Sequence, residues 1–126
     1  MPARVVDASA LAAVLFGEPE GERVAKALGR GPLFAPTLLR YEVGSVCLKK
    51  VRRHPDQRAE LLAALDLLGR MEVQEVEVPP LESTELAERA NLTVCDAAYL
   101  WLARSIGAPL VTLDERLEAA FRAAEA

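Results

Sequence analysis

Four acidic residues stand where strands are predicted to end or helices to begin, and carboxylates in such places can bind metal ions. Asp7 and Asp114 each follow a short apolar stretch directly. Glu42 and Asp96 fall early in two predicted helices. Ligands of open parallel sheets bind at the rim where the strands end. We therefore expect these four carboxylates to share one rim.

Each acid taken alone also has an ordinary structural explanation. Asp7 and Asp114 could cap helix N-termini, and Asp96 could favour the dipole of its helix. Glu42 could be a solvated surface acid. Taken together, four like charges repel one another strongly in a low-dielectric cleft. Two divalent cations would neutralise them and would suit phosphoryl transfer, by activating a water and stabilising the leaving oxygen.

The other ligand types in the chain narrow the choice of metal. The single histidine, His54, argues against a histidine-based zinc site and against a Ser-His-Asp triad. Cys47 and Cys95 lack CxxC spacing, so we expect two buried, reduced thiols. A metal would therefore be held by carboxylates, which favours a hard cation such as Mg²⁺ or Mn²⁺.

The elements that must position these acids alternate between strand and helix. Apolar stretches predict strands at 4–6, 33–35, 71–78 and 110–112. Helical periodicity and capping signals predict helices at 10–16, 20–28, 38–54, 55–68, 81–90, 94–106 and 115–124. No tight hairpin signal separates the strands. The pattern predicts an α/β fold, a three-layer sandwich with a mostly parallel sheet of four strands.

Four residues are expected to mark helix ends. Thr37, Thr93 and Asp114 are predicted N-caps, because short polar side chains accept the free N–H groups of a first turn. Gly107 is the predicted residue just beyond the C-terminus of the helix at 94–106.

Length and composition set the remaining limits. The 126 residues suit one domain, spanning 1–126. No apolar run approaches the roughly 20 residues that a membrane span needs, and the N-terminus shows no secretory pattern. We therefore expect a cytoplasmic protein. The net charge of −4 gives no global basic signal for nucleic-acid binding, but four clustered acids would account for it.

Four motifs of the chain resemble those of the PIN-domain nucleases, and within them the VapC-type toxins of bacterial toxin–antitoxin pairs. Val6-Asp7-Ala8-Ser9 resembles the opening D-x-S, and residues 39–43 resemble the helix that presents the second acid. Residues 93–99 are similar to T-x-x-D-A-x-Y, the most specific of the four. Residues 110–117 are similar to the closing T-x-D-x-x-L.

The resemblance implies a Mg²⁺-dependent endoribonuclease that hydrolyses RNA phosphodiester bonds. It places catalytic, metal-binding roles on Asp7, Glu42, Asp96 and Asp114. The hydroxyls of Ser9 and Thr112 would then orient the carboxylates or a water. It further implies a homodimer and a cognate antitoxin that inserts a segment near the site.

The resemblance has one departure. Many relatives close the sheet with a fifth strand after the last helix, whereas residues 121–126 show no strand signal. The sequence therefore leaves open whether the sheet has a fifth strand.

Phosphate contacts in a nuclease come from Arg and Lys beside the metals. Arg40 is nearest in sequence to Glu42, and Arg116 lies one turn from Asp114. The only dense basic cluster is Lys49, Lys50, Arg52 and Arg53. A solvated helix C-terminus, which the helix dipole favours, explains that cluster equally well, and Arg116 could be an ordinary surface arginine. Tyr99 and Trp101 suit the core or a dimer interface better than base stacking.

Two other functions compete with a nuclease. A non-catalytic PIN-like interaction module would bind a partner through its helices, and the presence of all four acids disfavours it. A small phosphatase or phospho-receiver domain also uses a carboxylate after its first strand. Such phosphatases usually show D-x-D where this chain has Ser9, and no lysine follows the fourth strand.

Overall fold

A parallel sheet of four short strands forms the centre of the computed structural model, which describes residues 1–125. The strands are β1 (Arg4–Val6), β2 (Leu33–Pro36), β3 (Val73–Val76) and β4 (Leu110–Val111). Their order across the sheet is β3-β2-β1-β4, and every pair is parallel. The chain therefore steps outward from β1 to β3 and then crosses to the other side of β1. The direction reverses between β1 and β4, where open α/β sheets form a ligand crevice.

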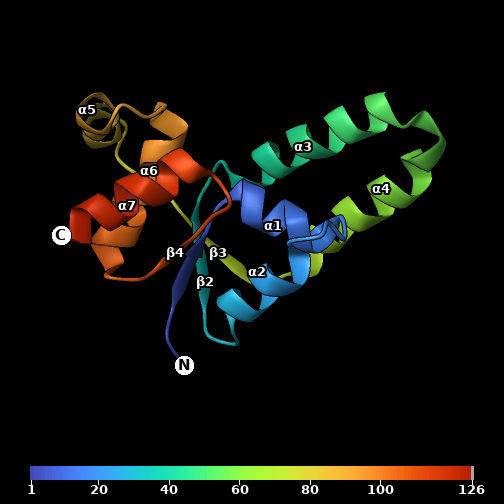
Figure 1. Cartoon of the computed structure of the whole chain (residues 1–126), viewed down its shortest axis with the longest axis horizontal. Coiled ribbons are helices and arrows are strands. Elements are labelled where there is room, and N and C mark those ends of the chain that lie inside the picture. Colours follow the sequence, from blue (N-terminus) through green and yellow to red (C-terminus); the bar gives the residue numbers. More distant parts are fainter. Residues whose placement is uncertain (126) are drawn as a thin grey trace.

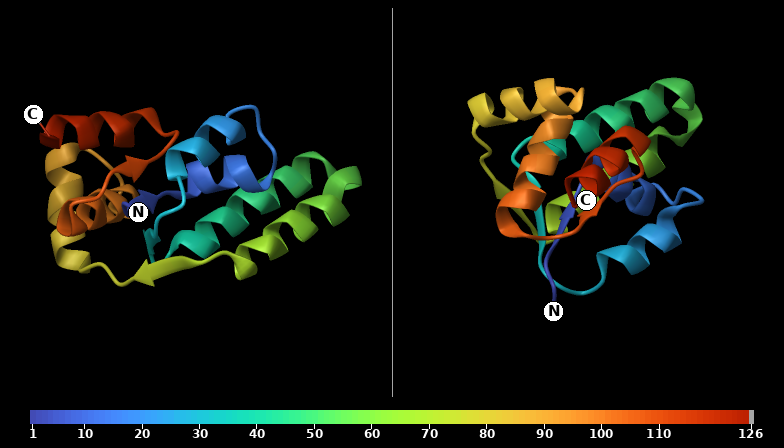
Figure 2. Two further views of the ribbon diagram at one scale, coloured as in Figure 1. Left: turned by 90° about the horizontal axis from the view of Figure 1, so that it is seen from below. Right: turned by 60° about the vertical axis from the view of Figure 1, so that its left-hand side comes forward.

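The helices pack in two layers, one on each face of the sheet (Figures 1 and 2). Right-handed crossovers put the helices of the outward steps on one face and those of the return step on the other. The first layer holds α1 (Ala8–Leu15), α2 (Gly21–Leu28), α3 (Leu39–Arg53) and α4 (Arg58–Asp66). The second holds α5 (Pro80–Ala90), α6 (Val94–Ile106) and α7 (Glu115–Glu125). The expected three-layer α/β sandwich is confirmed.

The core lies between these layers and is made of small and branched apolar residues. Val5 and Val6 of β1 are completely buried, one on each face of the sheet, as expected for a central parallel strand. Leu11 of α1 and Leu100 of α6 are also completely buried. Full burial of such a leucine stabilises the fold by about 1.5–3 kcal/mol. None of the helices within residues 1–125 is long and apolar enough to cross a membrane.

Three of the four predicted helix-end residues take the expected roles. The Thr93 side chain accepts the N–H of Asp96 at 3.1 Å, and the Asp114 side chain accepts the N–H of Leu117 at 3.0 Å. Gly107 ends α6 with a φ of 65°, a conformation that glycine adopts without steric cost.

The predicted N-cap at Thr37 is wrong. Leu38 occupies the N-cap position of α3 and provides no side-chain hydrogen bond. The backbone N–H of Thr37 instead donates to the Val76 carbonyl at 3.2 Å. Thr37 therefore continues the pairing of β2 with β3, and the helix begins one residue later than predicted, at Leu39.

Two further segments differ from their predicted bounds. The helix expected at 55–68 consists of a 3₁₀ turn (Pro55–Gln57), α4, and a second 3₁₀ turn (Leu67–Arg70). The strand expected at 71–78 shortens to β3. No fifth strand occurs within the described residues, since α7 runs to Glu125. The last residue of the stretch 121–126, Ala126, lies outside the described residues.

The prediction of two buried thiols holds for one cysteine only. Cys47 on α3 is buried, whereas Cys95 in the first turn of α6 is exposed. The buried side of that turn is taken by Ala97 and Ala98. Cys95 therefore lies on the solvent side of the helix.

Candidate metal centre

Asp7 lies at the point where the order of the strands reverses, and its side chain is buried. It is only 4% exposed. Its Oδ1 accepts the N–H of Ala10 at 3.0 Å and the hydroxyl of Ser9 at 2.8 Å. Its Oδ2 accepts the hydroxyl of Thr112 at 2.5 Å. Burial raises the pKa of Asp7, these hydrogen bonds oppose the rise, and the negative charge of Asp96 adds to it.

The Ser9 and Thr112 hydroxyls join the turn after β1 to the turn after β4. Ser9 Oγ accepts the N–H of Leu113 at 3.0 Å, and Thr112 Oγ1 accepts the N–H of Asp114 at 3.0 Å. Each hydroxyl therefore donates its proton to Asp7. Ser9 accepts a backbone N–H from the turn after β4, whereas Thr112 accepts one from its own turn. Both hydroxyls hold the Asp7 carboxylate in place, and their orienting role at a metal stays a prediction.

Glu42, half-buried on α3, is held by a tyrosine from the opposite helix layer. The Tyr99 hydroxyl donates to Glu42 Oε1 at 2.6 Å. Burial, and then this hydrogen bond, raise the pKa of Tyr99, so the phenol stays protonated as a donor. Burial also raises the pKa of Glu42, the bond from Tyr99 lowers it, and the charges of Asp96 and Asp7 raise it further.

This contact of Tyr99 was missed by the sequence analysis, which placed the residue in the core or at an interface. Tyr99 is indeed 1% exposed, but its hydroxyl points to an acid of the rim. A signal was present. Tyr99 follows Asp96 by three residues, and residues at that spacing share a helix face.

Asp96 links the other acids electrostatically. It lies half-buried in the first turn of α6, where burial and the charge of Asp114 raise its pKa. The charge of Asp96 in turn raises the pKa of both Asp7 and Glu42. Asp114 begins α7 as its N-cap. The structure thus brings all four predicted acids into one electrostatic cluster, which we call the acidic rim.

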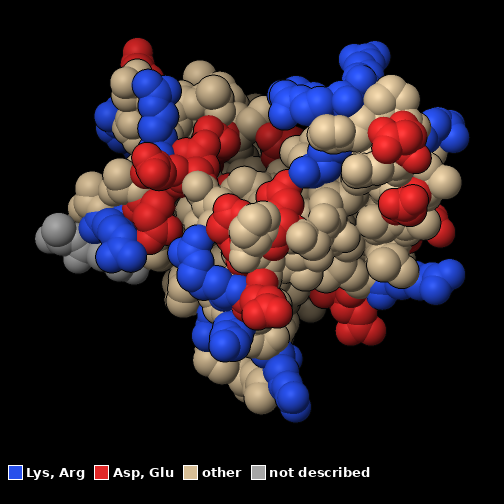
Figure 3. Space-filling model, turned by 45° about the vertical axis from the view of Figure 1, so that its right-hand side comes forward, with Lys and Arg blue, Asp and Glu red and all other residues tan. Residues whose placement is uncertain are grey.

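The acidic rim fits a hard divalent cation in its chemistry. None of its four carboxylates forms an ion pair with Lys or Arg in residues 1–123. Figure 3 shows several groups of acidic side chains on one face of the molecule, most of them toward its left and centre. Within residues 1–123, no three Asp, Glu, His or Cys side chains already form a metal cage. Mg²⁺ commonly uses one or two carboxylates, with water and substrate phosphate completing its shell.

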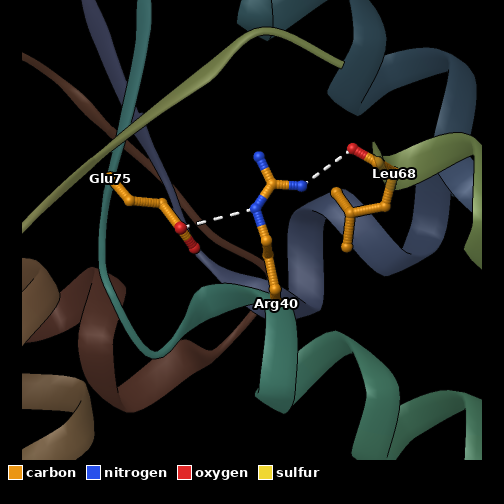
Figure 4. Close-up of polar contacts among 3 residues, drawn as sticks. All are labelled: Arg40, Leu68 and Glu75. Atoms are coloured by element: carbon orange, nitrogen blue, oxygen red, sulfur yellow. Dashed lines mark hydrogen bonds and ion pairs between the residues drawn. The ribbon is translucent and has the colours of Figure 1, made fainter. Parts of the chain in front are cut away.

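The predicted substrate-binding residues are dispersed. The Arg40 guanidinium donates to the Leu68 carbonyl at 2.9 Å and pairs with Glu75 at 3.4 Å (Figure 4). Lys50 pairs with Glu18 at 2.5 Å and lies 5.7 Å from the centre of the Phe16 ring. Lys49 and Arg116 are exposed. The structure therefore ties Arg40 and Lys50 to neighbouring elements.

Comparison with known proteins relates the whole chain to one family. A family model described as "PIN domain" matches residues 4–122. Ribonuclease VapC3 of Pyrobaculum aerophilum is 34% identical over 124 residues, which cover 94% of this chain and 95% of the relative. Ribonuclease VapC12 of Mycobacterium tuberculosis is 32% identical over 114 residues, covering 90% and 88%.

Solved structures agree with this relationship. The crystal structure of PAE2754 from Pyrobaculum aerophilum superposes with a TM-score of 0.72 at 31% identity, over 94% of this chain and 86% of that one. VapC20 of Mycobacterium tuberculosis, a toxin that cleaves the sarcin-ricin loop, superposes with a TM-score of 0.65 at 17% identity, over 93% and 94%, and so supports the fold alone. The chain belongs to the PIN-domain family, within its VapC group.

Proposed function

We propose that this protein is a metal-dependent endoribonuclease and the toxin of a toxin–antitoxin pair. The observation that carries the proposal is the acidic rim at the reversal of the strand order. The charge of Asp96 raises the pKa of Asp7 and of Glu42, and the charge of Asp114 raises the pKa of Asp96. None of the four carboxylates has a cationic partner within residues 1–123. The names of the VapC relatives support ribonuclease activity.

The proposed roles follow from where each carboxylate is held. Asp7, Asp96, Asp114 and Glu42 would hold Mg²⁺ or Mn²⁺. The bound cation would activate a water and stabilise the leaving oxygen of the RNA phosphodiester. Asp7 is the most rigid of the four, because both of its oxygens accept hydrogen bonds.

The neighbouring hydroxyls would keep those carboxylates in place. Ser9 and Thr112 fix the plane of the Asp7 carboxylate, and Tyr99 fixes Glu42, whose longer side chain has more freedom. Hydrogen-bond partners of this kind set the orientation of a metal ligand.

The deciding experiment is RNA cleavage by purified protein in Mg²⁺, Mn²⁺ or EDTA, with wild type and Asp7→Asn side by side. We expect cleavage by the wild type in metal, and none in EDTA or with the variant. Cleavage by Asp7→Asn equal to that of the wild type would refute the proposal. Mapping the cut sites would then define the RNA target.

A non-catalytic interaction module is the second candidate. The observation that favours it is that no three-residue metal cage is already assembled within residues 1–123. Calorimetric titration with Mn²⁺ separates the two functions. A nuclease should bind Mn²⁺ in a way that Asp7→Asn abolishes, whereas a module without a metal site should show no such binding.

The partners follow from the same family relationship. We propose a homodimer in solution and a cognate antitoxin that covers the acidic rim. Light scattering on the purified protein would test the dimer. Loss of RNA cleavage when the antitoxin is added would test the inhibition.

A further inference from the structure

A cavity of about 510 Å³ opens beside the acidic rim, between α2 and α7. Its walls carry residues of the acidic rim and its surroundings together with two arginines that were not candidates from the sequence. They are Thr112 and Asp114 from the turn after β4, Arg23 from α2, and Glu115, Glu118 and Arg122 from α7.

Arg23 is the cation of this cavity that remains available to a ligand. Arg122 pairs with Glu118 at 2.8 Å. Arg23 is exposed and forms no ion pair with any residue in 1–123. Two acids of the wall also lack such a pair within these residues. Asp114 belongs to the proposed metal site, and Glu115 is exposed.

The position of Arg23 is fixed by the packing of α2. A Cβ on Gly21 would lie 2.7 Å from the Ala13 carbonyl oxygen, so α2 approaches the backbone of α1 closely. Val24 and Leu28 bury the inner face of α2, and α2 also contacts β4. Arg23 therefore projects from a rigid helix beside the rim, with only its own side chain left mobile.

A nuclease of this kind has an electrostatic problem that Arg23 would solve. The acidic rim repels the RNA backbone, and metal ions can offset that repulsion only at the scissile phosphate. Phosphates on either side need Lys or Arg nearby. Arg40 and Lys50 are already engaged with Glu75 and Glu18. Figure 3 shows basic side chains at several places on the face that carries the acidic groups.

We propose that Arg23 binds a backbone phosphate of the RNA close to the scissile one, in the cavity beside Asp114. This inference rests on the proposed ribonuclease function. It assigns the α2 side of the acidic rim to the RNA strand, through a contact that does not depend on the base. Arg23 should therefore affect RNA affinity similarly for different sequences.

The test measures binding of a fluorescein-labelled, single-stranded RNA of mixed sequence to the Asp7→Asn protein, so that the probe is not cleaved. Anisotropy is recorded in Mg²⁺ at several salt concentrations. We expect Arg23→Ala to weaken binding by roughly three- to tenfold and to reduce the slope of log affinity against log salt by about 0.7. Arg23→Lys should keep most of the affinity, and Arg23→Glu should lose more than Arg23→Ala.

Arg30→Ala is the matched control. Arg30 is also exposed and lies two residues after the end of α2. It lines a different cavity, beside the first residues of β2 and β3, at the end of the strands opposite to the acidic rim. It should leave affinity and salt slope unchanged. In the background with Asp7 intact, Arg23→Ala should raise KM more than it lowers kcat.

Two outcomes would overturn the inference, and they differ. If the wild type cleaves RNA but Arg23→Ala binds the probe like Arg30→Ala, the subsite is wrong and the nuclease stands. If the wild type neither cleaves nor binds RNA, the proposed function fails and the subsite fails with it.

Discussion

Asp7 keeps a carboxylate in a buried position where an isolated charge would be strongly disfavoured. Three donors make this possible, namely a backbone N–H and the hydroxyls of Ser9 and Thr112. Burial nevertheless outweighs them and leaves the pKa of Asp7 raised. A bound cation would therefore stabilise the Asp7 carboxylate, which pairs with no Lys or Arg in the described part of the chain.

Removing the Thr112 hydroxyl should show how far the buried Asp7 carboxylate depends on its hydrogen-bond donors. Thr112→Val deletes the donor to Asp7 and the acceptor of the Asp114 N–H. We expect the free energy of unfolding to fall by about 1–3 kcal/mol and RNA cleavage to decrease. Urea denaturation measures the first effect. Thr112→Ser keeps the hydroxyl and is the control. A valine variant as stable and active as the wild type would show that the contact is not needed.

Asp96→Asn should make the protein more stable at neutral pH. The folded pKa of Asp96 is raised above the ordinary 3.8 by burial and by Asp114. The stability linked to this group is full below about pH 3.8 and is lost as pH rises through the higher folded pKa. Without metal, the Tm difference between variant and wild type should therefore be positive at pH 7 and shrink toward pH 4. A difference that does not change with pH would contradict this.

Tyr99→Phe should weaken metal binding with little damage to the core. The variant keeps the buried ring and loses only the hydroxyl that holds Glu42. Loss of such an orienting partner typically costs about 10–100-fold in metal affinity or activity. Mn²⁺ titration and cleavage kinetics measure it. Trp101→Phe is matched, because it removes a bond from the same helix to Glu82, away from the rim, and should leave both properties unchanged.

At the scale of elements, the first turn of α3 matters because it carries Glu42 and Arg40. Arg40 ties that turn to the Leu68 carbonyl after α4 and to Glu75 on β3. We expect Arg40→Gln to lower stability by up to about 1 kcal/mol, since the ion pair is partly exposed, and Glu75→Gln to lower it less. Thermal unfolding measures both.

The same pair of variants decides between two roles of Arg40. If it acts through α3, both variants should reduce stability and leave the affinity for RNA similar to that of the wild type. If Arg40 contacts phosphate, Arg40→Gln should weaken RNA binding in the anisotropy assay while Glu75→Gln does not. That second result would restore the role expected from the sequence.

The sequence predicted elements well where the signal was local. Thr93, Asp114 and Gly107 mark helix ends because a cap depends on residues a few positions away. Thr37 failed because its N–H pairs with Val76, thirty-nine positions along the chain, and no local pattern reveals that bond. Element existence was therefore predictable, and bounds that depend on strand pairing were not.

The candidate site divides in the same way. Its four acids could be found because each stands at the start of a helix or the end of a strand. The bond from Tyr99 to Glu42 spans 57 positions, and the cavity that joins Arg23 to Asp114 depends on how α2 packs on α1. Arg40 was chosen for its proximity in sequence to Glu42 and Lys50 as part of a dense basic cluster, and neither signal shows which partner a long side chain contacts.

At the scale of the whole molecule, the topology explains why acids distant in sequence meet. β1 and β4 are neighbours with Val6 opposite Val111, so the residues that follow them face each other across the reversal of the strand order. α3 brings Glu42 from one helix layer and α6 brings Asp96 from the other. The net charge of −4 is therefore unevenly spread, and the acidic rim is where a cation should have its largest effect.

That effect can be measured on the folded protein without any RNA. A cation that binds only the folded state at about ten times its Kd adds roughly 1.4 kcal/mol of stability, or several degrees in Tm for a domain of this size. We expect MgCl₂ to raise Tm more than NaCl of equal ionic strength, and Asp7→Asn to remove the difference. Equal Tm shifts with both salts would mean that the ions only screen the repulsion between the carboxylates and that Mg²⁺ does not bind a specific site.

The Mg²⁺ concentration needed to raise Tm should be high without RNA and lower when RNA is present. No three carboxylates form a cage in residues 1–123. These residues therefore offer Mg²⁺ an incomplete shell, which a substrate phosphate would complete. RNA should increase the Mg²⁺ affinity of the Arg23→Ala protein less than that of the wild type, because the variant binds the RNA strand more weakly. A tight Mg²⁺ site that RNA does not change would show that the rim closes on the metal by itself.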